Sequence, residues 1–241
     1  MNTLFYTMLF IVGVIVGSYL AIKAEEIPKR LDLRKTHYSN HKNEKLISKL
    51  TYIFMGGLTS VVLANVLRVN TYEIDPAKLI IYVFAMIYLS TLMITAGVDR
   101  NYTKIDKKLL AFGIIMSILY MLYLCMVDLA SVHLSIIYLG IYMILLLIDS
   151  FLLRKFAKDS YIVNNLILAT IILVFTDLRA LTYTLVMALV AIILYILLVK
   201  SQKSKNGNKK LKINEIPVGF FIAASNVMVL FMIRIFENYF I

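Results

Sequence analysis

Two aspartates, Asp99 and Asp159, border long apolar segments of the sequence. Asp99 directly follows Leu79–Val98, and Asp159 directly precedes Ser160–Thr176. Ionisable groups at the edges of such segments are costly in an apolar medium and usually have a function. Two carboxylates that face each other at one depth can share a proton. One then acts as general base on a water molecule, while the other polarises a carbonyl group. The pattern therefore makes Asp99 and Asp159 candidates for a catalytic pair.

The alternative for both aspartates is an ordinary ion pair with the basic residue beside each of them in the sequence. Arg100 follows Asp99, and Lys158 precedes Asp159. Structural ion pairs and catalytic carboxylates produce the same sequence pattern, so the pattern alone leaves both interpretations open.

The elements that must position these residues are apolar. The chain has 241 residues, of which 61% are hydrophobic and 16% charged, and its net charge is +11. Its mean hydropathy is +0.84. A soluble domain is about 45–50% apolar and about 25% charged, so the composition excludes an ordinary water-soluble domain. The single cysteine excludes a disulfide framework and a four-cysteine zinc site.

Eight segments are apolar and long enough, or nearly so, to cross a bilayer as helices, which needs roughly 20 residues. Unbroken apolar runs lack the alternation typical of a membrane β-barrel. We therefore predict an all-α fold: a polytopic helical bundle of about eight transmembrane helices that forms one integral membrane domain over residues 1–241. The predicted spans are Leu4–Ile22, Thr51–Leu67, Leu79–Val98, Leu109–Val127, Ser135–Leu153, Ser160–Thr176, Ala180–Val199 and Pro217–Ile233.

The basic residues predict the orientation of this bundle, because cytoplasmic loops are enriched in Lys and Arg. With the N-terminus outside, 21 of the 25 Lys and Arg residues lie on the inner side. The longer inner segments are a cytoplasmic loop at 24–50 and a flexible cytoplasmic loop at 201–214. The charge is thus explained by topology and no nucleic acid is expected as a partner. Both aspartates are predicted at the cytoplasmic face of the cell membrane.

Four stretches carry a likeness to a known family. They are Gly17–Leu20 followed by Ile27–Pro28, Val98–Asp99 with Ile105 six residues on, Asp159, and Ile216–Phe220. In their order, their spacing and the number of spans, these stretches resemble the type IV prepilin peptidases, which are membrane aspartyl proteases. The resemblance implies that Asp99 and Asp159 cleave the basic leader from a pilin-like precursor, just ahead of its hydrophobic helix. We expect no metal and no organic cofactor.

The chain departs from the family pattern at several positions. The family's Gly-x-Gly-Asp motif reads Phe156–Asp159, Tyr161 replaces a lysine, and Asp106 stands where a proline is expected. The first inner loop has His37 and His41 but no cysteine, whereas many bacterial members carry paired Cys-x-x-Cys motifs there. The N-methyltransferase activity that many bacterial members also have is therefore not carried over.

Helix dipoles assign separate roles to the two aspartates as a hypothesis. Asp159 stands at the start of a helix, whose positive end favours a charged carboxylate, whereas Asp99 stands at the end of one. This argument makes Asp159 the base and Asp99 the partner that holds the proton.

Other polar residues have simpler interpretations. Asp149 is expected to pair with Arg154 or Lys155, and His37 and His41 belong to a solvated loop rather than a metal site. Glu25 and Glu26 can meet a basic leader or serve as interface charges. Asparagines within spans are expected to form hydrogen bonds between helices, and small residues are expected to allow close helix packing. These are Asn164, Asn165 and Asn226, and Gly13, Gly17, Ser18, Gly56 and Gly57.

Two rival interpretations stay open. Within the same class, the chain can be an archaeal-type preflagellin peptidase, although the number of spans and the Ile216–Gly219 stretch favour the bacterial form. From another class, it can be a non-catalytic membrane scaffold or small transporter that keeps the fold. In that case Asp99 and Asp159 are interface charges or an ion relay.

Overall fold

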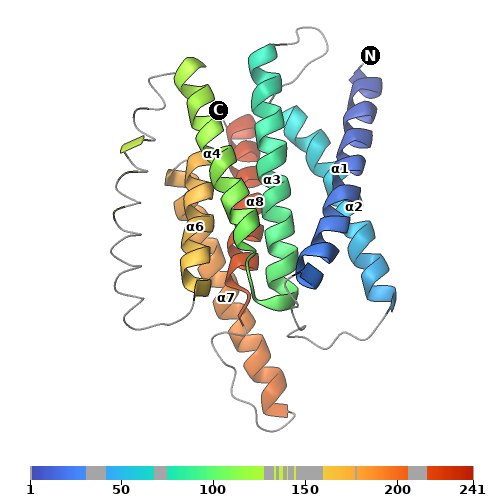
Figure 1. Cartoon of the computed structure of the whole chain (residues 1–241), viewed down its shortest axis with the longest axis vertical. Helices are drawn as coiled ribbons and strands as arrows, with labels where there is room; N and C mark the ends of the chain where they lie inside the picture. The colour runs from blue at the N-terminus through green and yellow to red at the C-terminus, as the bar shows by residue number, and fades with distance from the viewer. Residues whose placement is uncertain are drawn as a thin grey trace.

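The computed structural model describes residues 2–30, 42–67, 75–127, 160–176, 178–205 and 216–240, with single positions at 133, 136, 137, 140 and 144. Within these residues the protein is all-helical, which confirms the predicted fold class for this part of the chain. The helices are α1 (Asn2–Arg30), α2 (Lys42–Val66), α3 (Pro76–Tyr102), α4 (Lys107–Val127), α6 (Ser160–Phe175), α7 (Leu178–Lys205) and α8 (Val218–Phe240). They form a bundle (Figure 1).

Several helices are apolar enough to indicate a membrane-embedded protein. Four described segments have the length and composition to cross a membrane: Leu4–Lys29, Pro76–Tyr102, Lys107–Val127 and Leu178–Leu198. Two shorter apolar helices, Val163–Phe175 and Val218–Ile233, accompany them. The predicted span Thr51–Leu67 corresponds to the second part of α2. The predicted span Ser135–Leu153 falls outside the described residues, apart from single positions.

The helices α1, α2 and α7 extend well beyond the apolar segments that predict them, so the two predicted inner loops are partly helical. α1 runs on to Arg30, α2 already begins at Lys42 and α7 continues to Lys205. The predicted loop at 24–50 therefore includes the last residues of α1 and the first of α2, and the loop at 201–214 begins as helix. Helical hydrogen bonds need no apolar surroundings, and Lys, Arg and Glu favour the helix almost as well as Leu.

The charged end of α1 is stabilised by ion pairs. Lys23 forms an ion pair with Glu26, three residues further along, at 2.6 Å. Ion pairs at this spacing stabilise a helix. Glu25 reaches across to Lys49 of α2 at 3.2 Å. Of the two interpretations of Glu25 and Glu26, these contacts favour interface charges.

Glycines bring α1 and α2 into backbone contact, which confirms the predicted close packing. A side chain at Gly13 would lie 2.8 Å from the Cα of Gly57, and one at Gly56 would lie 2.7 Å from the Cα of Gly17. Since real Cβ atoms do not approach other atoms so closely, any larger residue at these positions must push the helices apart. Small residues that allow such approach are typical of helix contacts in membranes.

Contacts between side chains fix the directions of the helices. Antiparallel α3 and α8 are joined near one end by Asp99 and Phe220, and farther along by Tyr88 and Asn226. The helices α4 and α6 instead run parallel. Asn164 at the start of α6 donates to the carbonyl of Ile105 just before α4. About two turns further along both helices, a side chain at Gly113 would contact Ile171. In Figure 1 both helices accordingly point the same way.

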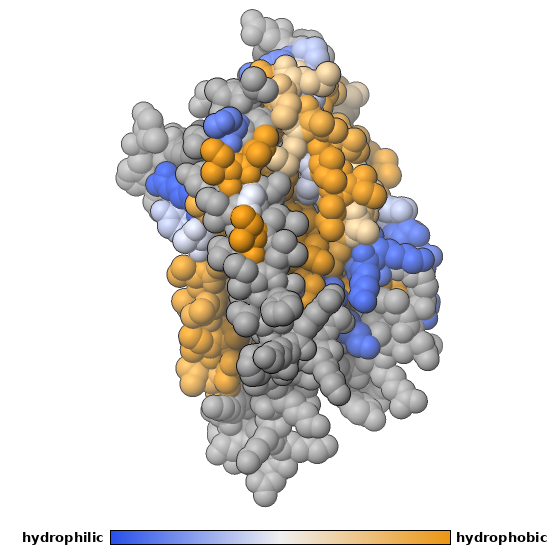
Figure 2. All heavy atoms as spheres, turned by 60° about the vertical axis from the view of Figure 1, so that its left-hand side comes forward, coloured by the Kyte–Doolittle hydropathy of each residue, from blue (hydrophilic) through white to orange (hydrophobic). Residues whose placement is uncertain are grey.

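The outward surfaces of the helices are apolar. Exposed large side chains include Ile115, Ile118, Leu119 and Leu122 on α4, and Val186, Leu189, Val190, Leu194 and Leu197 on α7. Figure 2 shows broad hydrophobic areas over the described part of one face. Soluble monomers rarely expose contiguous apolar surface beyond a few hundred Å², so these faces fit a lipid environment.

Candidate active site at the end of α3

Asp99 lies in the last turn of α3 and is completely buried, with 0% of its surface exposed. The helix ends just beyond it, because Thr103 adopts a left-handed conformation with φ 49°. The N–H of Thr103 donates to the carbonyl of Asp99 at 2.8 Å, which closes the helix. The carboxylate is therefore held on a defined helix end rather than on a loop.

The segment after α3 turns the chain into α4 and is itself buried at Ile105 and Asp106. The Oδ1 atom of Asp106 accepts from the N–H of Lys108 at 3.1 Å, so Asp106 is the N-cap of α4. The acid that replaces an expected proline thus has a local structural role. It fixes the start of α4 directly beside the Asp99 turn.

The first turn of α8 supplies a hydrogen bond to Asp99. The backbone N–H of Phe220 donates to Oδ2 of Asp99 at 2.9 Å, joining residues 121 positions apart. N–H groups in the first turn of a helix have no partner within the helix. Here a carboxylate from α3 accepts from one of them. The positive end of α8 and this N–H both stabilise the charged form of Asp99.

Gly219 allows this approach because it has no side chain. A Cβ atom at this position would lie 3.1 Å from Oδ2 of Asp99, 3.0 Å from Oδ1 of Asn165 and 2.7 Å from Cδ1 of Ile105. Any larger residue would have to displace the carboxylate, the amide or the isoleucine. Four segments of the chain therefore meet at Gly219: the end of α3, the turn before α4, the start of α6 and the start of α8.

The start of α6 contributes two buried asparagines, each 7% exposed. Nδ2 of Asn164 donates to the carbonyl of Ile105 at 3.4 Å, a bond between elements as the sequence predicts. Asn165 lies beside Gly219, as its distance to a Cβ there shows. The predicted hydrogen bonding of Asn226 is also confirmed, since it accepts from Tyr88 of α3 and donates to Thr184 of α7.

Arg100, the residue that follows Asp99, contacts the first turn of α8. Its guanidinium lies over the ring of Phe220, 5.7 Å from the ring centre, and the residue is exposed. The backbone of Phe220 thus bonds Asp99 while its ring contacts Arg100. Such cation–π contacts are worth about 0.5–1 kcal/mol at exposed sites.

The second predicted catalytic residue, Asp159, lies outside the described residues, as do Asp149, His37 and His41. The description of α6 begins at Ser160, the next residue in the chain. Within the described residues, no group of three or more His, Cys, Asp or Glu side chains is placed to hold a metal ion.

The position of Asp99 changes the dipole argument for the two roles. The sequence places Asp99 only at the negative end of its own helix, α3. In the structure it also lies at the positive end of α8, which has the opposite effect on the carboxylate. The dipoles of α3 and α8 thus act on Asp99 in opposite directions, so helix dipoles alone do not assign the proton to it.

The sequence singles out Asp99 as a candidate, but it does not indicate the hydrogen bond that the Phe220 N–H donates to it. The available signal was Gly219 within the Ile216–Phe220 stretch, because a glycine in a first helical turn can permit close approach. Comparisons with known proteins identify no relative: no protein-family model, no curated protein and no solved structure matches this chain.

Proposed function

We propose that this protein is a membrane-embedded aspartyl endopeptidase of the prepilin-peptidase type, with Asp99 and Asp159 as its catalytic pair. Its substrate is a pilin-like precursor, whose basic leader is cut off at the cytoplasmic face of the cell membrane. The observation that carries this proposal is a fully buried carboxylate held at the meeting point of three helices in a mostly apolar bundle. An ionisable group inside a membrane bundle is energetically costly, and such groups usually have a function.

The place of α6 supports the pairing with Asp159. Asn164 and Asn165, about one turn into α6, lie against Ile105 and Gly219 next to Asp99. Asp159 immediately precedes α6 in the sequence, which is consistent with the proposed pairing.

The parallel directions of α4 and α6 support eight spans. Two helices that start at the same end of a bundle are consistent with a further span between them in the sequence. The sequence predicts such a span at Ser135–Leu153. The strong bias of Lys and Arg toward the Asp99 side then supports an N-terminus on the outside.

The proposed chemistry uses the two carboxyl groups in complementary states. One carboxylate takes a proton from a water molecule, whose oxygen attacks the carbonyl carbon of the scissile peptide bond. The other, protonated, donates a hydrogen bond to the carbonyl oxygen. Collapse of the tetrahedral intermediate breaks the C–N bond, and the leaving nitrogen takes a proton from a carboxyl group. The products are the leader with a new carboxyl terminus and the mature protein with a new amino terminus.

The test is cleavage of a pilin-like precursor by the purified protein in detergent, with Asp99→Asn and Asp159→Asn variants. Each change should lower the rate by about 10²–10⁴, the usual contribution of general acid–base catalysis. Asp106→Asn is the matched control, because Asn replaces a buried acid of the same turn and still caps α4. It should cleave like the wild type.

Two outcomes would overturn the proposal. Full activity in Asp99→Asn would remove the aspartate from catalysis. Absence of cleavage by the wild type across a panel of precursors would instead favour the non-catalytic scaffold or transporter, for which the loss of both motif glycines before Asp159 already speaks.

A further inference from the structure

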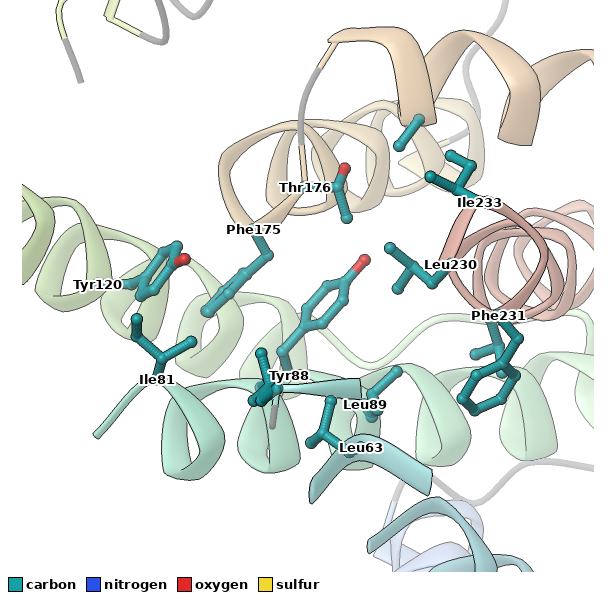
Figure 3. Close-up of a pocket in the computed structure, with 14 residues that line it drawn as sticks. Leu63, Ile81, Tyr88, Leu89, Tyr120, Phe175, Thr176, Leu230, Phe231 and Ile233 are labelled. Carbon is teal, nitrogen blue, oxygen red and sulfur yellow. The ribbon is translucent and has the colours of Figure 1, made fainter. Parts of the chain in front are cut away.

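A second feature lies toward the other end of the same helices. A cavity of about 300 Å³ opens between α2, α3, α4, α6, α7 and α8. Its walls come from the first half of α3, the last residues of α6 and the second half of α8, whereas Asp99 lies where α3 ends and α8 begins. Figure 3 shows Tyr88 projecting into this space between Phe175 and Leu230.

The walls of the cavity are apolar. Most of the lining side chains are aliphatic or aromatic, and the polar exceptions are Tyr88, Tyr120 and Thr176. The hydroxyl of Tyr88 donates to Asn226, and that of Thr176 donates to the carbonyl of Ile172 at 2.7 Å. A buried water needs two to four polar partners. Three hydroxyl groups among the lining side chains offer few such partners, so most of this space is suited to an apolar ligand.

Stacked aromatic rings form one flat wall. Phe175 stacks on Tyr88 with ring centres 4.6 Å apart, and on Tyr120 with ring centres 5.0 Å apart. Rings held in this way cannot easily rotate to fill the space beside them. The cavity is therefore a preformed feature of the packing, like most ligand sites in proteins.

The size and the surroundings of the cavity indicate the occupant. Ligand pockets begin at about 300 Å³, and an apolar cavity of about half that volume already stays dry and binds small hydrocarbons. Lining residues such as Leu67, Ile81 and Phe231 are partly exposed, so the cavity communicates with the outside. The neighbouring Ile80 and Val83 on α3 are exposed apolar side chains. In a bilayer, alkyl chains surround such a surface.

We propose that this cavity is a binding site for one alkyl chain of a membrane lipid. The chain lies against the wall formed by Tyr88, Tyr120 and Phe175 and stays bound when the surrounding lipids are removed. This role is independent of peptidase activity, since the site shares none of its lining side chains with the Asp99 end.

The absence of tryptophan from the sequence provides a sharp test. A Phe175→Trp variant places a single fluorophore in the aromatic wall, and a Leu122→Trp variant places one on the exposed face of α4, where Leu122 is 57% exposed. Both proteins are reconstituted in phosphatidylcholine vesicles with dibrominated acyl chains, which quench tryptophan on contact. They are then extracted and washed in unbrominated dodecyl maltoside.

In the vesicles both variants should be quenched. After extraction, Leu122→Trp should recover its emission, whereas Phe175→Trp should remain quenched by a retained lipid chain. Adding Ala85→Phe, which fills the cavity from α3, should abolish the retained quenching. Ala111→Phe on the exposed face of α4 is the matched control and should leave it unchanged.

Recovery of Phe175→Trp together with Leu122→Trp would overturn the proposal, and it is also the outcome expected if a segment of this chain occupies the cavity. Retained quenching that persists in the Ala85→Phe variant would overturn it as well, because the lipid chain would then be bound elsewhere.

Discussion

The two ends of the bundle use the same helices in opposite ways. At one end, α3, α6 and α8 approach so closely that a Cβ atom at Gly219 would lie only 2.7–3.1 Å from Ile105, Asn165 and Asp99. At the other end the same three helices stand around a cavity walled by aromatic rings. Tight packing around an ionisable group holds it in one geometry, whereas loose packing around apolar side chains leaves room for a ligand. The difference indicates that the Asp99 end keeps a side chain in a fixed position, whereas the cavity end has room for a ligand.

A series of hydrogen bonds beside the cavity joins α3, α8 and α7. Tyr88 of α3 donates to Oδ1 of Asn226 of α8, whose Nδ2 donates to Thr184 of α7 at 3.0 Å. Thr184 in turn donates to the carbonyl of Ala180 at 2.7 Å. All these groups are buried. Because Tyr88 also lines the cavity, these hydrogen bonds fix one wall of the cavity and the axial position of α8 together.

The largest effect of a single methyl group is expected at the tight end. Gly219→Ala places a Cβ atom 3.1 Å from Oδ2 of Asp99 and should displace the carboxylate or the start of α8. A misplacement of about 1 Å in a catalytic group can cost about 10² in rate. A contact of 3.1 Å is relieved by a shift of a few tenths of an ångström, so we expect a smaller loss, below about 10², in precursor cleavage measured under single-turnover conditions.

Gly140→Ala is the control for this prediction, since a Cβ atom there would meet nothing within 4 Å. It should retain the wild-type rate. Equal rates for wild type and Gly219→Ala would show that the tight packing around Asp99 is unrelated to activity, and the contrast between the two ends would lose its functional meaning.

The second prediction compares the same substitution in filled and in hollow surroundings. Ala223→Phe inserts a ring into the core beside α8, where Ala223 is 1% exposed, and overpacking of this kind costs about 1–3 kcal/mol. Ala85→Phe inserts the same ring into the cavity and should be tolerated at clearly lower cost. Thermal unfolding in detergent measures both. Equal destabilisation would show that the cavity has no usable room.

The sequence predicted the tight end better than the hollow one, for a physical reason. A buried acid, a glycine in a first helical turn and paired asparagines are rare in apolar segments, so Asp99, Gly219 and Asn164 stand out. Their mutual contact depends on how α3, α6 and α8 pack, which no local pattern contains. The hydrogen bond from Phe220 to Asp99 was missed because a backbone N–H has no sequence signature.

The cavity left no trace in the sequence because ordinary apolar residues build it. Leu63, Ile81 and Leu230 would read the same in a filled core, and only the three-dimensional packing shows that they leave space. The apolar segments predicted that the described part of the chain is helical and where the apolar part of each helix lies. They did not predict the helix ends, since α1 and α7 continue into charged residues after the apolar run.

A smaller effect is expected at the turn that follows Asp99. Asp106→Ala removes the N-cap of α4, and loss of such a cap costs typically about 1 kcal/mol. Asp106→Asn keeps the cap and should restore most of that stability. The measurement is again thermal unfolding of both variants in detergent. An equal loss in both variants would show that Asp106 acts through its charge instead of through the bond to Lys108.

The smallest effect is expected at the hydrogen bonds that join Tyr88, Asn226 and Thr184 beside the cavity. Tyr88→Phe removes the hydroxyl that donates to Asn226 but keeps the ring stacked on Phe175. Hydrogen bonds between membrane helices average about 0.6 kcal/mol, so the stability loss should be of that order. A double-mutant cycle with Thr184→Val isolates the coupling, because both residues bond the same asparagine.

The informative readout of this variant is its separate effect on the two regions. If the hydrogen bonds of Asn226 fix both the cavity wall and the position of α8, Tyr88→Phe should lower lipid retention at the Phe175→Trp probe. It should also slow precursor cleavage to a small extent. A change in lipid retention alone would mean that the two ends are mechanically independent. In that case the close approach at Gly219 would be sufficient by itself to hold α8 against Asp99, without help from the middle of the bundle.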